Sequence, residues 1–287
     1  MSEVPHPYAG RSAVLATMHG KARAVAPAFA QRVGLNVVET AGLDTDALGT
    51  FSGETPRRGT MLETAVEKAR LGMAATGLRL GIASEGSFGP HPQIPFLPAG
   101  IELMVFVDAD RGWVIHESMI AERTNFAHLV SAPGAPLDTF LAQVGFPQHA
   151  LMVRPNAGER AAAWAKGIAD RGDLDRAVAA AAAASADRCA LIETDMRAHR
   201  NPTRMDALAG LATRLALRLA AQCPACSAPG WGRIDVTRNL PCELCGLPTH
   251  VIAAEIFGCA VCSHRESQPR PDGMVFAQAM HCDACNP

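Results

Sequence analysis

The sequence predicts an α/β protein in which a mixed sheet is flanked by helices, followed by a small β module at the C-terminus. Strand-like apolar runs alternate with helical patterns over about the first 220 residues. Hydrophobic residues make up 48% of the chain and aromatic ones only 5%, which suits alanine-rich helices packed on a sheet. Eight of the nine cysteines lie in the last quarter. We therefore expect an α/β domain over residues 1–222 and a metal-binding module over residues 223–287.

The expected elements follow in order along the first domain. The helix at 60–76 has the clearest start, because Thr60 as N-cap and Glu63 three positions later form a capping box. Two stretches rich in proline and glycine, 86–100 and 132–136, are expected as loops. Apolar runs predict strands at 12–17, 34–39, 79–83, 101–107, 112–117 and 189–194. Helical patterns lie at 19–32, 60–76, 137–144, 158–170, 174–186 and 203–221.

The C-terminal module carries four Cys-x-x-Cys pairs. Gaps of 15 and 19 residues (227–241 and 263–281) fit the spacing of zinc ribbons. Eight thiolates are enough for two tetrahedral zinc sites, so we expect two structural Zn²⁺ ions. The predicted metal ligands are Cys223, Cys226, Cys242, Cys245, Cys259, Cys262, Cys282 and Cys285.

Two ways of pairing these cysteines are compatible with the sequence. The gap lengths favour sequential pairing, with the first two pairs around one ion and the last two around the other. The stretch 232–237 alternates apolar and polar residues like a strand. One strand between successive pairs would instead bring the first and third pairs to the same end, which gives a cross-braced module. We expect the sequential arrangement.

Composition also bears on compartment and partners. The N-terminus lacks the basic and apolar regions of a signal peptide, and no run of about 18 apolar residues is present. Reduced cysteines in a cytoplasmic protein are therefore expected, and Cys189 is interpreted as a small core residue. The chain has a net charge of −2, and residues 223–287 hold four arginines against six carboxylates. Two zinc sites would add about four negative charges, which disfavours nucleic acid as a partner.

Three polar stretches follow predicted strands, where open α/β sheets bind ligands. Each stretch can be interpreted either as part of a ligand-binding site or as ordinary local structure. Residues 17–21 could hold phosphate through Lys21 and a helix start, or form a plain loop. Glu85 could bind Mg²⁺, or it could be a turn residue, as Glu63 could be only a cap. Residues 195–204 contain three arginines and could bind phosphate. Alternatively, they form a solvated loop with internal ion pairs.

Taken together, these stretches resemble the inosine/xanthosine triphosphate pyrophosphatases and the related Maf proteins. Ala16-Thr17…Lys21 is similar to their opening motif, and residues 60–69 resemble their Thr-Phe-x-Glu-Asn-Ala-x-x-Lys-Ala helix. Residues 83–88 fall where that family has Ala-Asp-Asp-Ser-Gly-Leu, and 198–200 where it has Ser-His-Arg. Ser84 replaces one of the paired acids, which puts activity in question. The whole chain, with its cysteine tail, resembles the DUF6671-type bacterial proteins of unknown function.

The resemblance implies a nucleotide pyrophosphatase-like fold and Mg²⁺-dependent hydrolysis of a nucleoside triphosphate between its α and β phosphates. Glu85 and Glu63 would hold Mg²⁺ as catalytic residues. The alternative is a non-catalytic nucleotide sensor or adaptor whose zinc module contacts a partner protein. The leucines of helix 203–221 pack either inside the chain or against a second copy. The implied substrate-binding residues are Thr17, His19, Lys21, Lys68, Asp195, Arg197, His199 and Arg200.

Overall fold

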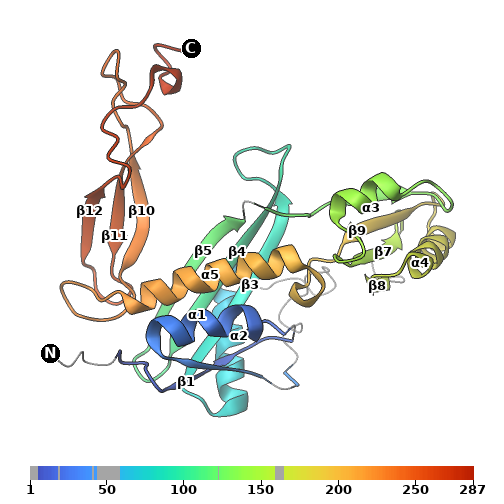
Figure 1. Ribbon diagram of the computed structural model, residues 1–287, viewed down its shortest axis with the longest axis horizontal. Coiled ribbons are helices and arrows are strands. Elements are labelled where there is room, and N and C mark those ends of the chain that lie inside the picture. Colours follow the sequence, from blue (N-terminus) through green and yellow to red (C-terminus); the bar gives the residue numbers. More distant parts are fainter. Residues whose placement is uncertain (1–5, 19, 41, 44–58, 122, 159–164) are drawn as a thin grey trace. The chain divides into compact units, whose positions relative to one another are not determined.

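The computed structural model describes residues 6–18, 20–40, 42–43, 59–121, 123–158 and 165–287 (Figure 1). The chain divides into two compact units, Met1–Ala216 and Leu217–Pro287. The boundary between them falls inside a long helix, α5 (Pro202–Ala220). The first unit is mixed α/β and the second contains a small antiparallel sheet, as the sequence predicts.

A five-stranded mixed sheet forms one part of the first unit. Its strand order is β2-β1-β3-β4-β5. Strand β1 is parallel to both neighbours, whereas β3, β4 and β5 pair antiparallel. The strands are β1 (Ser12–Leu15), β2 (Asn36–Glu39), β3 (Leu80–Pro90), β4 (Pro98–Asp108) and β5 (Trp113–Ala121).

Two helices follow the first two strands, α1 (Ala22–Val33) after β1 and α2 (Met61–Thr76) after β2. Helix α2 covers one face of the sheet with a stripe of small apolar residues, because Ala65 and Ala69 pack against Ala83 and Val105. The expected capping box is confirmed at its start: the Thr60 side chain accepts from the Glu63 N–H, and the Glu63 carboxylate accepts from the Thr60 N–H. Burial of Ala83 and Val105 beneath α2 fixes the register of their strands, because a shift of one residue would turn these side chains to the other face of the sheet.

A second, antiparallel sheet of order β6-β9-β7-β8 completes the first unit together with α3 (Asp138–Val144) and α4 (Arg171–Ala184). Helix α4 is capped by Asp170, whose side chain accepts from the Asp173 N–H. Its buried Leu174 joins Leu151 and Ile192 of the sheet in a separate core. The strands are β6 (His128–Ser131), β7 (Leu151–Pro155), β8 (Ala165–Ile168) and β9 (Ala190–Thr194).

The second unit contains three antiparallel strands in sequence order, β10 (Gly232–Arg238), β11 (Ile252–Gly258) and β12 (Arg265–Pro269). Gly232 pairs with Gly258, and Gly258 pairs with Arg265 on its other side. The start of β10, the end of β11 and the start of β12 thus share one end of this sheet. The opposite end carries the β10–β11 connection and the segment after β12.

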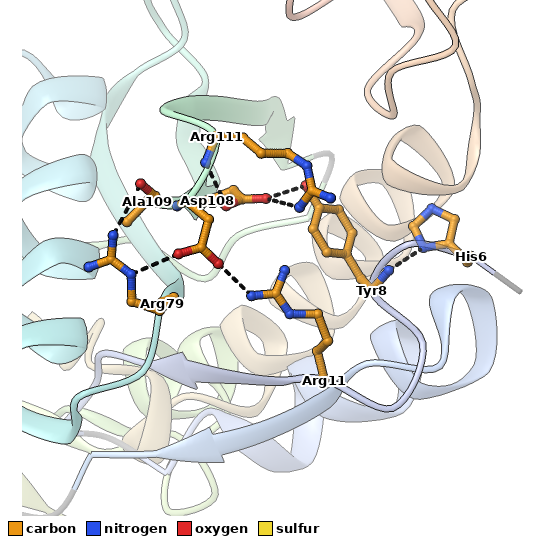
Figure 2. A network of polar contacts seen from close by, with 8 residues as sticks. His6, Tyr8, Arg11, Arg79, Asp108, Ala109 and Arg111 are labelled. Atoms are coloured by element: carbon orange, nitrogen blue, oxygen red, sulfur yellow. Dashed lines mark hydrogen bonds and ion pairs between the residues drawn. The ribbon is translucent and has the colours of Figure 1, made fainter.

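A polar network ties the N-terminal segment to the turn between β4 and β5 (Figure 2). The buried Tyr8 hydroxyl donates to Asp108 Oδ2 at 3.0 Å, and Arg111 donates to the same oxygen at 3.0 Å. Arg11 and Arg79 both donate to the neighbouring Asp110, at 2.7 and 2.8 Å. Burial and the Asp108 carboxylate raise the pKa of Tyr8 above its usual value. The network is structural, since it satisfies a buried carboxylate at the end of β4.

Several sequence-based predictions are corrected. Residues 165–168 form strand β8 in place of the end of the expected helix 158–170, and 159–164 lie outside the described residues. The alanines there favour a helix, but pairing with β7 decides the conformation. The expected loop 86–100 is mostly the paired ends of β3 and β4. Strands β6 and β7 have no counterpart among the predicted elements.

Candidate functional sites: two cysteine clusters and a buried charge cluster

The eight predicted cysteine ligands form two groups in the second unit. Cys223, Cys226, Cys259 and Cys262 make one cluster, and Cys242, Cys245, Cys282 and Cys285 make the other. In each cluster the four sulfur atoms lie within 4.8 Å of one another. Sulfur pairs are 3.7 and 3.8 Å apart in the first cluster and 3.5 and 3.9 Å apart in the second.

These distances fit tetrahedral zinc. Four sulfurs at the usual Zn–S distance of about 2.3 Å lie about 3.8 Å from one another. A disulfide would need about 2.0 Å between sulfurs, and all nine cysteines are free thiols. Both clusters can therefore hold a structural zinc ion with four protein ligands and no open position, which is the arrangement of structural sites.

The pairing of the clusters corrects the sequential order expected from the gap lengths. The first and third pairs share one cluster, and the second and fourth share the other. Strand direction is the physical reason. Because β10 and β11 are antiparallel, the pair before β10 meets the pair after β11 at one end of the sheet. Strand β12 then returns the chain to the other end. The module is cross-braced.

Backbone geometry favours thiolates in both clusters. The Leu244 N–H points to Cys242 Sγ at 3.5 Å, and the Val261 N–H points to Cys259 Sγ at 3.2 Å. Amide hydrogen bonds lower the pKa of Cys242 to about 7, whereas the hydrogen bond with Cys245 helps raise that of Cys285 to about 12. Four crowded thiols cannot all ionise alone, so a cation at the centre is required for the full ligand set.

Histidines next to the cysteines have partners of their own. His264 stacks on Trp231, with ring centroids 5.4 Å apart, and its Nε2 lies 2.9 Å from the Glu266 carboxylate. His250 lies 3.4 Å from Asp283. Neither histidine belongs to a cysteine cluster.

A buried charge cluster lies on the five-stranded sheet of the first unit. Lys68 from α2 forms an ion pair with Glu85 of β3, and both side chains are about nine-tenths buried. Lys21, at the start of α1, donates to Ser84 Oγ at 3.0 Å. Three segments that are distant in sequence thus deliver two lysines and a carboxylate to adjacent positions of one strand.

Arg204 and Glu102 belong to the same cluster. Arg204 Nε donates to Glu102 Oε1 at 2.6 Å and Nη2 to Oε2 at 3.2 Å, both with buried side chains. The pKa of Lys21 is lowered to about 8, mainly by burial and also by the positive charges of Arg204 and Lys68, while the carboxylates of Glu102 and Glu85 oppose this shift. The pKa of Lys21 therefore depends on all four other charged residues of the cluster.

Strand alternation divides this cluster between the faces of the sheet. Ser84 and Gly86 point to the face that carries Glu102, since Gly86 pairs with Glu102 across the strands. Glu85 points to the opposite face, toward α2. Gly86 permits the approach of the arginine, because a Cβ there would lie 2.5 Å from Arg204 Nη2. The expectation that Glu85 follows the strand in a turn is wrong: it lies within β3.

Resident Mg²⁺ does not fit these residues. Glu63 is exposed, and its carboxylate is committed to the α2 capping box, where the Thr60 N–H lowers its pKa. Glu85 is ion-paired with Lys68, and Glu102 with Arg204. Within the described ranges, only the cysteine clusters bring three or more potential metal ligands together. Magnesium prefers carboxylate oxygens and water, and the carboxylates of Glu63, Glu85 and Glu102 are already paired with other groups.

The remaining predicted substrate residues lie elsewhere or serve local structure. Thr17 hydrogen-bonds with Thr40, and the first α1 amide, that of Ala22, donates to Glu39 at 2.7 Å. Asp195 is buried and holds Arg197 by a two-point ion pair. His199 and Arg200 are exposed. His19 lies outside the described residues.

A cavity of about 270 Å³ opens between the end of β5 and the first turns of α5. Met119, Ala121 and Ala207 give it apolar walls, and Arg123 and Asp206 are charged groups on its lining. Met119 pairs with Glu102 across β4 and β5. The cavity therefore borders the face of the sheet that carries the Glu102–Arg204 pair.

Glu102 and Arg204 are absent from the predicted site residues, although the sequence contains a signal for each. Glu102 is a lone charge in an apolar strand, Ile101 to Val107. Arg204 lies four positions before Leu208 and seven before Leu211, on the buried face of α5. A charge on a buried face needs a partner of opposite sign, so the two could have been matched with each other.

The fold and the sites define a mixed α/β protein with a C-terminal module that can hold two structural zinc ions. The chain belongs to the family described as Domain of unknown function (DUF6671), whose model matches residues 68–287. The match includes Lys68, Glu85 and all eight clustered cysteines and begins after Lys21. Among curated proteins no match is found. In the described part of the chain, no helix has both the length and the apolar character needed to cross a membrane.

Proposed function

We propose that the first unit binds a nucleoside triphosphate by its phosphates at the Lys21–Lys68–Glu85 cluster and hydrolyses it to a monophosphate and pyrophosphate. The observation that carries this proposal is the convergence of two lysines and Arg204 on two buried carboxylates. Among these side chains cations outnumber anions by one, and phosphate is the natural ligand of such a group.

In the proposed reaction, an incoming phosphate chain takes Lys68 and Lys21 as its counter-ions. Glu85 is thereby released to accept a proton from water, whose oxygen attacks the α-phosphorus. The bond from that phosphorus to the bridging oxygen breaks, and pyrophosphate leaves with the electron pair. Magnesium enters only as a counter-ion carried by the nucleotide, because the described carboxylates do not form a resident site. Positioning and charge stabilisation supply most of the rate.

We further propose that the fold of this unit is of the nucleotide pyrophosphatase type. What supports it is the order in which the matching motifs reach one cluster: Lys21 after the first strand, Lys68 on the capped helix, and Glu85 on the next strand. The zinc module is proposed to be structural, with metal supplying most of its folding free energy.

A second candidate is nucleotide binding without cleavage. Ser84 occupies the place of an acid, and its hydroxyl accepts a hydrogen bond from Lys21. Glu63 is held in its capping box. One carboxylate then remains for chemistry where the resembling family uses more, which favours a sensor that binds and retains its ligand.

Two measurements on the zinc-loaded full chain test both candidates. The first is thermal stabilisation by ITP, XTP, GTP and ATP, with and without Mg²⁺. The second is pyrophosphate release. Glu85→Gln is expected to reduce release by at least about 100-fold while nucleotide still binds. The exposed Glu67→Gln on α2 is the matched control and should behave like wild type. Binding without release supports the sensor, and absence of binding contradicts both candidates.

A further inference from the structure

Six exposed apolar side chains, here called the apolar patch, lie on the two segments that carry the second cysteine cluster. Its members are large hydrophobic side chains that are between 41% and 74% exposed. They come from the loop inside the second cysteine pair, from the residues just after it, and from the segment before the fourth pair. The patch consists of Leu244, Leu247, Met274, Val275, Phe276 and Met280.

Backbone hydrogen bonds hold the two segments of the patch together. The Glu243 N–H donates to the Ala277 carbonyl at 2.9 Å, and the Ala277 N–H donates to the Pro241 carbonyl at 2.8 Å. The Glu243 carboxylate also accepts from the Ala279 N–H at 3.1 Å. Cys242 and Cys282, within and beside these segments, share the second cluster. The two backbone segments that carry the patch are therefore held together by hydrogen bonds and by the second cysteine cluster.

The first cluster provides an internal comparison. Val261 has the same position in its pair as Leu244 has in the second, directly before the second cysteine. Val261 is 37% exposed and Leu244 is 74% exposed. Trp231 beside the first cluster packs on Phe257 and His264. A Cys-x-x-Cys turn does not by itself create a large exposed apolar surface, so the patch is a property of the second cluster.

The charge around the patch restricts what can cover it. Glu243 and Asp283 lie next to cysteines of the second cluster, and Asp272 precedes the patch segment. Two arginines lie at this end of the sheet: Arg270 is paired with Asp272, and Arg238 donates to the His250 carbonyl. Four thiolates around one Zn²⁺ would add about two negative charges. A nucleic acid, an anionic membrane or a second copy of this end would bring like charge to the same surface.

We propose that the patch docks a segment of another protein that presents apolar side chains among basic residues. The apolar contacts would supply most of the affinity, and the acidic surroundings would select the sign of the partner's charge. The proposal is independent of nucleotide binding in the first unit. It assigns the second zinc cluster a role in recognition and leaves the first cluster a structural role.

The test uses the zinc-loaded full chain and two labelled peptides of about 18 residues, patterned as amphipathic helices. One contains leucine and lysine, and the other has glutamate in place of lysine. Binding is measured by fluorescence anisotropy at low and high salt. The variants are Leu244→Ser and Phe276→Ser, and Val261→Ser is the control at the equivalent position of the first cluster. Zinc content of two ions per chain verifies that each variant is folded.

We expect the lysine peptide to bind and the glutamate peptide not to bind. Leu244→Ser and Phe276→Ser should each weaken binding at least about 10-fold, and Val261→Ser should leave it unchanged. Salt should weaken the interaction. Equal binding of both peptides, no binding of the lysine peptide, or equal effects of all three variants would overturn the proposal. So would self-association of the wild type that Phe276→Ser abolishes, because a second copy would then cover the patch.

Discussion

Arg204 and Glu102 meet at two points inside the first unit, with nitrogen–oxygen distances of 2.6 and 3.2 Å, although 102 positions separate them. The guanidinium also donates to the Met196 carbonyl at 2.5 Å and lies over the Phe88 ring at 5.2 Å. This one side chain links α5, the segment before it, and both long strands β3 and β4. It also lowers the pKa of Lys21.

Glu102→Gln is expected to destabilise the first unit strongly. The substitution leaves the buried Arg204 without its counter-charge, and breaking one half of a buried pair costs about 3–5 kcal/mol. Urea unfolding of the zinc-loaded chain, followed by far-UV circular dichroism, measures the loss. The double variant Glu102→Leu with Arg204→Met should recover most of the stability, because no charge is then buried. If the single variant costs less than about 1 kcal/mol, the pair is not buried as described.

Double cysteine variants distinguish the two pairing schemes by zinc content alone. Cys223→Ser with Cys259→Ser damages only the first cluster, so one zinc ion per chain should remain. Cys223→Ser with Cys242→Ser damages one ligand in each cluster and should leave no fully coordinated zinc. Sequential pairing predicts the reverse. Mass spectrometry of the native protein gives the count, and Cys189→Ser, which lies in the first unit, should keep two ions.

Lys21 should give the unfolding free energy a distinctive dependence on pH. Its pKa is about 8 in the folded chain and 10.5 in the ordinary state. Between these values the unfolded state binds more protons, so stability rises with pH by up to about 1.4 kcal/mol per unit. Lys21→Met removes this contribution. The difference between wild type and variant, measured by urea unfolding from pH 7 to 10, should change across this window. A constant difference would show that Lys21 is not desolvated.

Tyr8 is the only tyrosine of the chain, so its ionisation can be followed directly by absorbance near 295 nm. Burial and Asp108 raise its pKa, and the folded protein should therefore show no phenolate near pH 10, where free tyrosine is half ionised. Its contribution to stability is present below pH 10 and lost above it. Tyr8→Phe should cost about 1.5–3 kcal/mol, because Asp108 loses a donor. If the Tyr8 hydroxyl of the folded protein is half ionised at pH 10, as in free tyrosine, the side chain is not buried against Asp108.

Local signals in the sequence predict much of the first unit. The Thr60–Glu63 capping box fixes the start of α2, and apolar runs locate β1, β4 and β9 within a few residues. The predictions fail where pairing with a strand distant in sequence determines the local conformation. Strand β8 lies in an alanine-rich stretch and is extended because β7 pairs with it. Gly86 and its neighbours favour a loop by composition, yet they continue β3 because β4 runs beside them.

The candidate sites show the same division. All eight cysteine ligands are predictable, because two pairs of Cys-x-x-Cys turns with suitable gaps already define zinc chemistry. Which two Cys-x-x-Cys pairs share a cluster is not predictable in this way. That pairing depends on the direction of the strands between them, and the gap lengths do not encode strand direction. In the charge cluster, the matching motifs contain Lys21, Lys68 and Glu85. They do not contain Glu102 and Arg204, which pair with each other on the opposite face of the sheet from Glu85.

Cross-bracing also sets an order of assembly during synthesis. All four sulfurs of the first cluster have been translated once residue 262 is added, whereas the second still awaits Cys282 and Cys285. The ligands of the first cluster are therefore all synthesised before the ligand set of the second cluster is complete. Metal binding by the first cluster would hold one end of the β10–β11 hairpin, and metal binding by the second cluster would then fix its other end.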